Sequence, residues 1–311
     1  MPLGIDPTVD YVFKRLFGDP ANADVLIHLL NSVLEFPDPI TEVTILNPSF
    51  EKESESDKLA ILDVKAKDCT GRLFNVEIQT SITIAIKERL VYYTSCLYTE
   101  QLLEGVSYAR LRPAICICFL SSTLFRNTSE PHLAFFLGDA VTGIRLTDQF
   151  QIHTVELSKY NLSEAELTTA TRLQKWAWFM NHASECDAAR LRSLLTAPEH
   201  LKATGVIEVI SKSPEEKMLY DARMKAIRDQ KMFTEDLIEA NQIAVETARK
   251  VAIQEGRQEG RQEGRLVGRI QTLQEMLDEP VVADEVLISM SNAELELLLE
   301  QLRARFSNRR Q

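Results

Sequence analysis

The chain has 311 residues, 45% of them hydrophobic, and its 35 Lys and Arg against 46 Asp and Glu give a net charge of −11. This composition is typical of a globular protein and excludes a chain that is disordered along its whole length. The acidic balance disfavours a nucleic-acid binder that uses a broad basic surface. The longest apolar runs are much shorter than the roughly 18 to 20 residues of a membrane span. Since the N-terminus has no hydrophobic signal segment, we expect a cytoplasmic protein.

Helix and strand periods alternate through roughly the first 160 residues. Helices are expected at residues 8–17, 23–34 and 83–103. Strands are expected at residues 40–46, in a hairpin within 59–80, and at 112–120, 132–138 and 151–160. Such alternation is typical of an α/β domain in which helices pack on a mixed sheet. We therefore predict a first domain at residues 1–160.

Beyond residue 160 the periodicity is almost wholly helical, which predicts a helical C-terminal region at residues 161–311. One of its helices is expected to follow Ser213 as the cap, because Pro214 suits the first helical position and acids follow it. An amphipathic helix capped by Ser291 or Asn292 is expected to close the chain.

The C-terminal region contains the repeat EGRQEGRQEGRLVGR, within about residues 250–270. It has glycine at 256, 260, 264 and 268, and a glycine inside a helix costs about 1 kcal/mol relative to alanine. One interpretation is a flexible, highly charged connector. The other is a helix whose small residues let a second helix approach closely, which predicts a homo-oligomer formed through the C-terminal helical region.

The stretch Leu59–Thr80 alternates apolar and polar residues on both sides of a central DCTG. Residues that face each other in a hairpin must lie on the same side of the sheet, because a one-residue slip would oppose apolar and polar rows. A three-residue loop, Cys69–Gly71, with glycine in the left-handed conformation satisfies this condition. The resulting register places Asp63 directly opposite Glu77.

Facing residues have Cβ atoms about 4.5 to 5.5 Å apart, so two opposed carboxylates repel unless a positive charge lies between them. Mg²⁺ or a related divalent cation with oxygen ligands meets that need. Lys65, opposite Asn75 on the same face, is a competing neutralising group. The same register places Ile61 opposite Gln79. The alternative without function is a solvated amphipathic hairpin that has two acids by chance.

Asp63 followed across a turn by Glu77-Ile78-Gln79 resembles the D…(D/E)-x-K signature of the PD-(D/E)XK nuclease superfamily, with glutamine in the lysine position. Other stretches carry a closer resemblance, in chain order, to the Rpn family of recombination-promoting nucleases and transposase-like proteins. They are DYVFKRLFG, LDVKAKDCTGRLFNVEIQ, ERLVYYTSCLYTEQLLEGVSY, RPAICICFL and PEEKMLYDARMKAIRD. The resemblance thus covers most of the chain.

The resemblance implies a restriction-endonuclease-like fold, with a mixed sheet flanked by helices, and metal-dependent hydrolysis of DNA phosphodiester bonds. It implies that Asp63 and Glu77 bind Mg²⁺, or another divalent cation such as Mn²⁺ or Ca²⁺, with the backbone carbonyl of Ile78 as a further ligand. Gln79 would orient the attacking water. Because an amide does not titrate in the useful range, Gln79 cannot replace lysine as a base.

Three further polar residues are candidates for the same site. Asp10 matches the family's acidic residue in the first helix and is either an outer metal or water contact or a surface acid. Lys14, one helical turn on, would bind phosphate or pair with Asp10. Arg89, in the helix after the hairpin, would reach a phosphate or a site carboxylate, or form a surface ion pair. Tyr93, four residues further on, is expected in the core.

Two alternatives to a DNA endonuclease stay open. Gln79, the acidic net charge and the repeat would also suit a catalytically weak or inactive member that acts as an assembly or DNA-associated module. A transposase proper would need strand transfer in addition to cleavage, and no residue pattern separates it from an endonuclease.

Overall fold

The computed structural model describes residues 1–46, 63–102, 105 and 107–309, which form two compact units, residues 1–227 and 228–311. Its helices are α1 Asp10–Phe17, α2 Ala23–Val33, α3 Ile86–Thr99, α4 Arg172–His182, α5 Ala188–Leu194, α6 Pro198–Lys212, α7 Pro214–Met276, α8 Asp284–Ile288 and α9 Asn292–Asn308. Its strands are β1 Val43–Ile45, β2 Val64–Asp68, β3 Leu73–Gln79, β4 Ala114–Leu120, β5 His132–Gly138 and β6 Arg145–Glu156. The acidic, serine-containing stretch EKESESD, residues 51–57, whose composition predicts a solvated turn, lies outside the described residues.

Within the described part of the first unit, six strands form one mixed sheet in the order β1-β2-β3-β4-β6-β5. The pairs β3–β4 and β4–β6 are parallel, and the remaining pairs are antiparallel. Each predicted strand is present. The last one is longer than expected, because β6 begins at Arg145 and pairs with β5 across a bulge.

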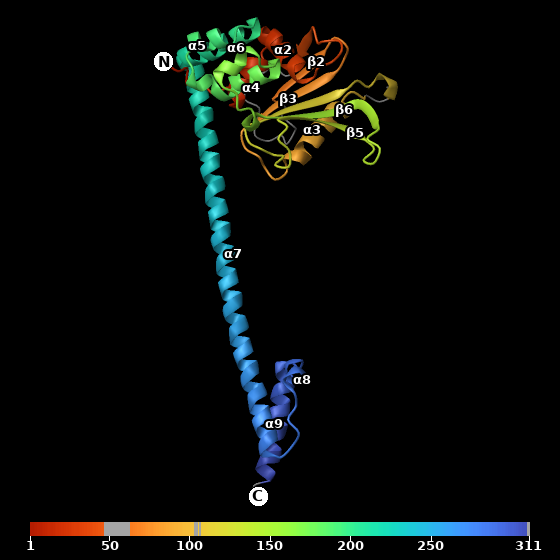
Figure 1. The fold of residues 1–311 in the computed structure, drawn as a ribbon, viewed down its shortest axis with the longest axis vertical. Helices are drawn as coiled ribbons and strands as arrows, with labels where there is room; N and C mark the ends of the chain where they lie inside the picture. Colours follow the sequence, from red (N-terminus) through yellow and green to blue (C-terminus); the bar gives the residue numbers. More distant parts are fainter. Residues whose placement is uncertain (47–62, 103–104, 106, 310–311) are drawn as a thin grey trace. The chain divides into compact units, whose positions relative to one another are not determined.

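Helices cover both faces of this sheet (Figure 1). On one face, Phe13 of α1 packs with Phe74 of β3 and Phe119 of β4 in the main core. On the other face, Ile86 and Leu90 of α3 pack against β4. Strand β4 is buried along its whole length because both of its faces are covered. The architecture is therefore the predicted α/β sheet flanked by helices.

The helices after residue 160 extend the same core. Trp176 and Phe179 of α4 and Ile207 of α6 belong to the main cluster, together with α1 and α2. The first compact unit therefore continues to residue 227, beyond the proposed nuclease-like domain at residues 1–160. The region after residue 160 is helical, as expected.

The second unit consists of most of α7 followed by α8 and α9. Leu295, Leu299 and Leu302 of α9 pack against Val267 and Ile270 of α7 in a small separate core. The glycine repeat lies inside α7, so it is helical, and a Cβ added at any of its four glycines would meet no atom within 4 Å. In the part of the chain that the structure describes, none of the helices has the length and hydropathy of a membrane span.

Candidate active site

The turn of the β2–β3 hairpin fixes the register of the site. Gly71 has φ +92°, the left-handed conformation predicted for it. Its N–H donates to the Asp68 carbonyl at 3.0 Å, and the Asp68 N–H donates to the Arg72 carbonyl at 3.1 Å. The ladder then pairs Val64 with Val76, which confirms the predicted register.

Asp63 lies one residue before β2, at the open end of this ladder. Its Oδ2 accepts the backbone N–H of Ile78 at 3.1 Å, so the side chain lies against the residue that follows Glu77. The Asp63 charge also helps to raise the pKa of Glu77. The hairpin therefore brings the two acids together. Ile61, the predicted partner of Gln79, lies outside the described residues.

Glu77 is 2% exposed, although it is an acid in the middle of a sheet. Burial, and then the nearby Asp63 charge, raises its pKa to about 7. Three groups oppose that rise: hydrogen bonds from Asn75 and Gln79, and the charge of Arg89. Asn75 Nδ2 lies 2.8 Å from Glu77 Oε1. A carboxylate in this position attracts a cation, because little water is in contact with it to stabilise its negative charge.

Asp63 has a second set of charged neighbours. Burial raises the pKa of Asp63, and the Ile78 N–H and the Lys14 charge oppose the rise. Asp10 adds to the rise, and Arg223 lowers the pKa. Asp10 and Lys14 of α1 are thus close enough to act on Asp63, whereas Arg89 acts on Glu77.

Arg223, which sequence reasoning missed, is the partner of Asp10. Its Nε lies 2.7 Å from Asp10 Oδ1, and its Nη2 lies 2.5 Å from Asp10 Oδ2. Because the two residues are more than 200 positions apart, no local pattern predicts the pair. The available signal was that Arg223 lies within PEEKMLYDARMKAIRD, one of the stretches that carry the family resemblance.

The first turns of α7 are fastened to the N-terminal segment, which holds Arg223 in place. Tyr220 Oη accepts the backbone N–H of Asp6 at 3.1 Å. Glu216 forms an ion pair with Arg15 at 3.0 Å and a short hydrogen bond with Tyr11. The start of the long helix is therefore held beside Asp10 of the candidate site.

Asn75 was also missed as a member of the site, although its position could have been predicted. It lies two residues before Glu77, and residues two apart on a strand share a face. Lys65, the competing neutralising group, forms an ion pair with Glu100 at 2.6 Å. Arg89 Nη2 lies 3.2 Å from the hydroxyl of Tyr93, which packs partly buried beside Leu97.

The donor atoms suit a hard divalent cation, because two carboxylates contribute oxygen ligands from adjacent strands. Among the residues that the structure describes, no group of three or more His, Cys, Asp and Glu side chains is arranged to hold a metal ion. A site at Asp63 and Glu77 would therefore need a backbone oxygen, such as the Ile78 carbonyl, and water to complete its coordination.

The family model of the PD-(D/E)XK nuclease family transposases matches residues 7–236 of the chain. The chain belongs to this family. The matched span includes both carboxylates and extends into α7 beyond Arg223, as the resemblance of the short stretches implied. The mixed sheet flanked by helices agrees with this assignment. No curated protein and no solved structure is significantly similar to the chain.

The buried Glu77 carboxyl predicts a pH-dependent stability without metal. Its pKa is higher in the folded chain than in the unfolded one, so the folded state binds the proton more tightly. Stability should therefore fall as pH rises from about 4.5 through about 7, by at most about 3 kcal/mol. We expect Glu77→Gln to remove this loss and to melt several degrees higher than the wild type at pH 8 in EDTA.

Thermal unfolding at pH 6 and pH 8 measures this effect, with Asp148→Asn as a control at an exposed acid. Mn²⁺ should raise the melting temperature of the wild type at pH 8 but not that of Glu77→Gln. Parallel pH profiles for the wild type and Glu77→Gln would contradict the account.

Proposed function

We propose that the protein is a metal-dependent DNA endonuclease that hydrolyses phosphodiester bonds and is linked to DNA recombination or mobile elements. The observation that carries the proposal is the buried Glu77 carboxylate beside Asp63, in the hairpin that holds the family's signature. A carboxyl with a strongly raised pKa, next to a second acid, is typical of a functional site.

Asp63, Glu77 and the backbone carbonyl of Ile78 would hold the ion, with Mg²⁺ as the first choice and Mn²⁺ or Ca²⁺ as alternatives. When bound, the ion would activate water and stabilise the charge that develops on the phosphate. Hydrolysis adds the water oxygen to phosphorus, breaks the bond to the leaving sugar oxygen, and transfers a proton to that oxygen.

Side chains of the chain itself would place the water and the DNA. Gln79, half-buried at the end of β3, hydrogen-bonds Glu77 and would orient the attacking water with its amide. Asp10, held by Arg223, would bind a water at the edge of the site. Lys14 and Arg89 would contact phosphate oxygens, which would provide local positive charge on an acidic protein.

The second candidate is a catalytically weak or inactive family member that acts as an assembly or DNA-associated module. Two features favour it: Gln79 replaces the lysine of the signature, and nearby cations already compensate both acids. Lys14 and Arg223 oppose the pKa rise of Asp63, and Arg89 opposes that of Glu77. Strand transfer, which defines a transposase proper, and the expected cytoplasmic location both stay predictions.

Cleavage of plasmid DNA separates these candidates. We expect the wild type to nick or linearise plasmid with Mg²⁺ or Mn²⁺, and Asp63→Ala and Glu77→Ala to lose about 100-fold or more of that rate, because each removes a ligand oxygen. Asp148→Ala, at an exposed acid outside the site, should cleave like the wild type. Equal activity in all four proteins would refute the assigned site. An inactive wild type that still binds Mn²⁺ would favour the second candidate.

We also propose that the chain forms a homo-oligomer through its C-terminal helical region. From residue 228 to residue 262, every position of α7 is exposed, including Phe233, Leu237 and Val251. Most helical stability in proteins comes from the packing of an apolar face. A second copy of α7 would supply such a face, and the four exposed glycines would permit close approach.

Light scattering on the full chain and on a chain that ends at residue 250 tests the oligomer. The truncated chain should have the lower number of subunits. Gly260→Leu should also weaken association, because a side chain would fill the close approach, whereas Gln258→Leu, on another side of the helix, should have a smaller effect. If both the full chain and the shortened chain have the mass of a monomer, the oligomer proposal is wrong and the repeat serves only as a connector.

A further inference from the structure

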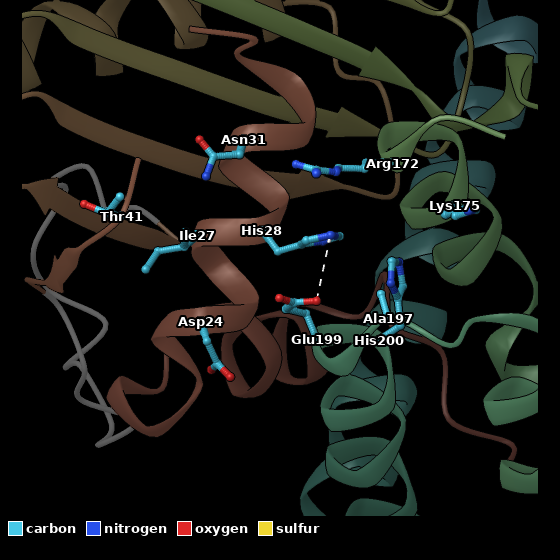
Figure 2. A pocket seen from close by; sticks show the side chains of 10 residues that line it. All are labelled: Asp24, Ile27, His28, Asn31, Thr41, Arg172, Lys175, Ala197, Glu199 and His200. Carbon is cyan, nitrogen blue, oxygen red and sulfur yellow. Dashed lines mark ion pairs between the residues drawn. The ribbon is translucent and has the colours of Figure 1, made fainter. Parts of the chain in front are cut away.

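A pocket of about 620 Å³ opens on the helical side of the first unit. It lies between α2, the segment before β1, the start of α4 and the start of α6 (Figure 2). Its volume is in the range of pockets that bind small molecules. It shares no residue with the candidate active site, so its function is a separate question from DNA cleavage.

His200 is the most unusual residue of its wall. It is 1% exposed and stacks on Trp176 at 4.1 Å between ring centroids. Within the described part of the chain, neither of its ring nitrogens has a hydrogen-bond partner. Burial lowers its pKa to about 3, and the charges of His28 and Lys175 act in the same direction. The ring is therefore neutral, and it keeps one N–H donor and one acceptor nitrogen buried behind the surface of the pocket.

His28 supplies a second donor with a defined direction. Its Nδ1 accepts the indole N–H of Trp176 at 2.9 Å, so the proton of the neutral ring lies on Nε2. Nε2 lies 3.9 Å from Glu199 Oε2, as the dashed line in Figure 2 marks. Burial lowers the pKa of His28, the charge of Glu199 opposes that lowering, and the charge of Arg172 adds to it.

Arg172 and Lys175 give the pocket its positive charge. In the ranges that the structure describes, neither forms an ion pair with an acid, whereas Asp24 of the pocket is paired with Lys202. Arg172 extends from α4 toward the His28 side of α2 (Figure 2).

The first turn of α6 brings opposing charges to the pocket, because the acid Glu199 lies beside the N-terminus of the helix. Ala197, its N-cap, makes no side-chain cap bond, and an uncapped helix N-terminus favours an anion. Two cations, the His28 donor and this helix end thus line one hollow, where Glu199 is the acid that opposes them. Phosphate oxygens match such a set, because they accept several charge-assisted hydrogen bonds at once.

We propose that this pocket binds a small molecule that carries a phosphate group, with the phosphate between Arg172 and Lys175 and a hydrogen-bonding group against His28 and His200. Because both His200 nitrogens are buried, a shift of the ring toward the ligand on binding would give them the partners that they lack. The ligand fills the hollow between α2, α4 and α6. Free phosphate and a nucleoside monophosphate share this chemistry and differ in whether they reach His200.

Calorimetry on the full chain tests the proposal with inorganic phosphate and with thymidine monophosphate, in the presence of EDTA. The double variant Arg172→Gln/Lys175→Gln should bind each probe about tenfold or more weakly than the wild type. The matched control is Arg192→Gln/Lys212→Gln, which removes the same charge from a surface cluster around Glu208. The control should bind both probes like the wild type.

His200→Phe keeps a ring against Trp176 and removes both nitrogens. Weaker binding of thymidine monophosphate with unchanged binding of phosphate would place the organic part of the ligand at His200. Equal affinity in the two double variants would overturn the proposal, as would the absence of binding of either probe at millimolar concentration. Binding that Glu77→Gln abolishes would also overturn it, since the probe would then occupy the candidate active site.

Discussion

The register of the β2–β3 hairpin is the constraint on which the candidate site depends. A slip of one residue would move the apolar row of β3 out of the core and turn Glu77 to the opposite face. Two features fix this register. Gly71 adopts the left-handed conformation that the turn needs, and the side chains along β3 are buried in the core at Phe74, Val76 and Ile78. The placement of the acids is thus a consequence of how the core packs, and the core tolerates an ionisable group in the middle of β3.

The buried carboxylate of Glu77 destabilises the fold unless a nearby positive charge or a hydrogen bond compensates its negative charge. Arg89 of α3 opposes the pKa rise of Glu77. Lys14 of α1 and Arg223 at the start of α7 oppose that of the neighbouring Asp63. The first turns of α7 are bonded to the N-terminal segment, so this part of the helix supports the site.

The features of this arrangement that depend on residues close together in the sequence could be predicted. Period-two alternation and one glycine were sufficient to predict the hairpin and its register. The periodicity of the apolar residues was sufficient to predict the sheet and its helices. The pair of Arg223 with Asp10 could not be predicted, because it depends on how a distant helix packs. The pocket at His200 was missed for the same reason, since its walls come from separate helices. The sequence around an isolated histidine does not indicate whether its ring nitrogens will find hydrogen-bond partners in the fold.

The most direct test of the central claim is a calorimetric titration of the full chain with Mn²⁺ at pH 8. The account predicts one saturable site that is lost in both Asp63→Asn and Glu77→Gln, because each removes a negative charge and replaces a carboxylate oxygen by an NH2 group without changing the apolar core. Binding of Mn²⁺ with the same affinity in the wild type and in both variants would contradict the account, since the ion would then lie elsewhere.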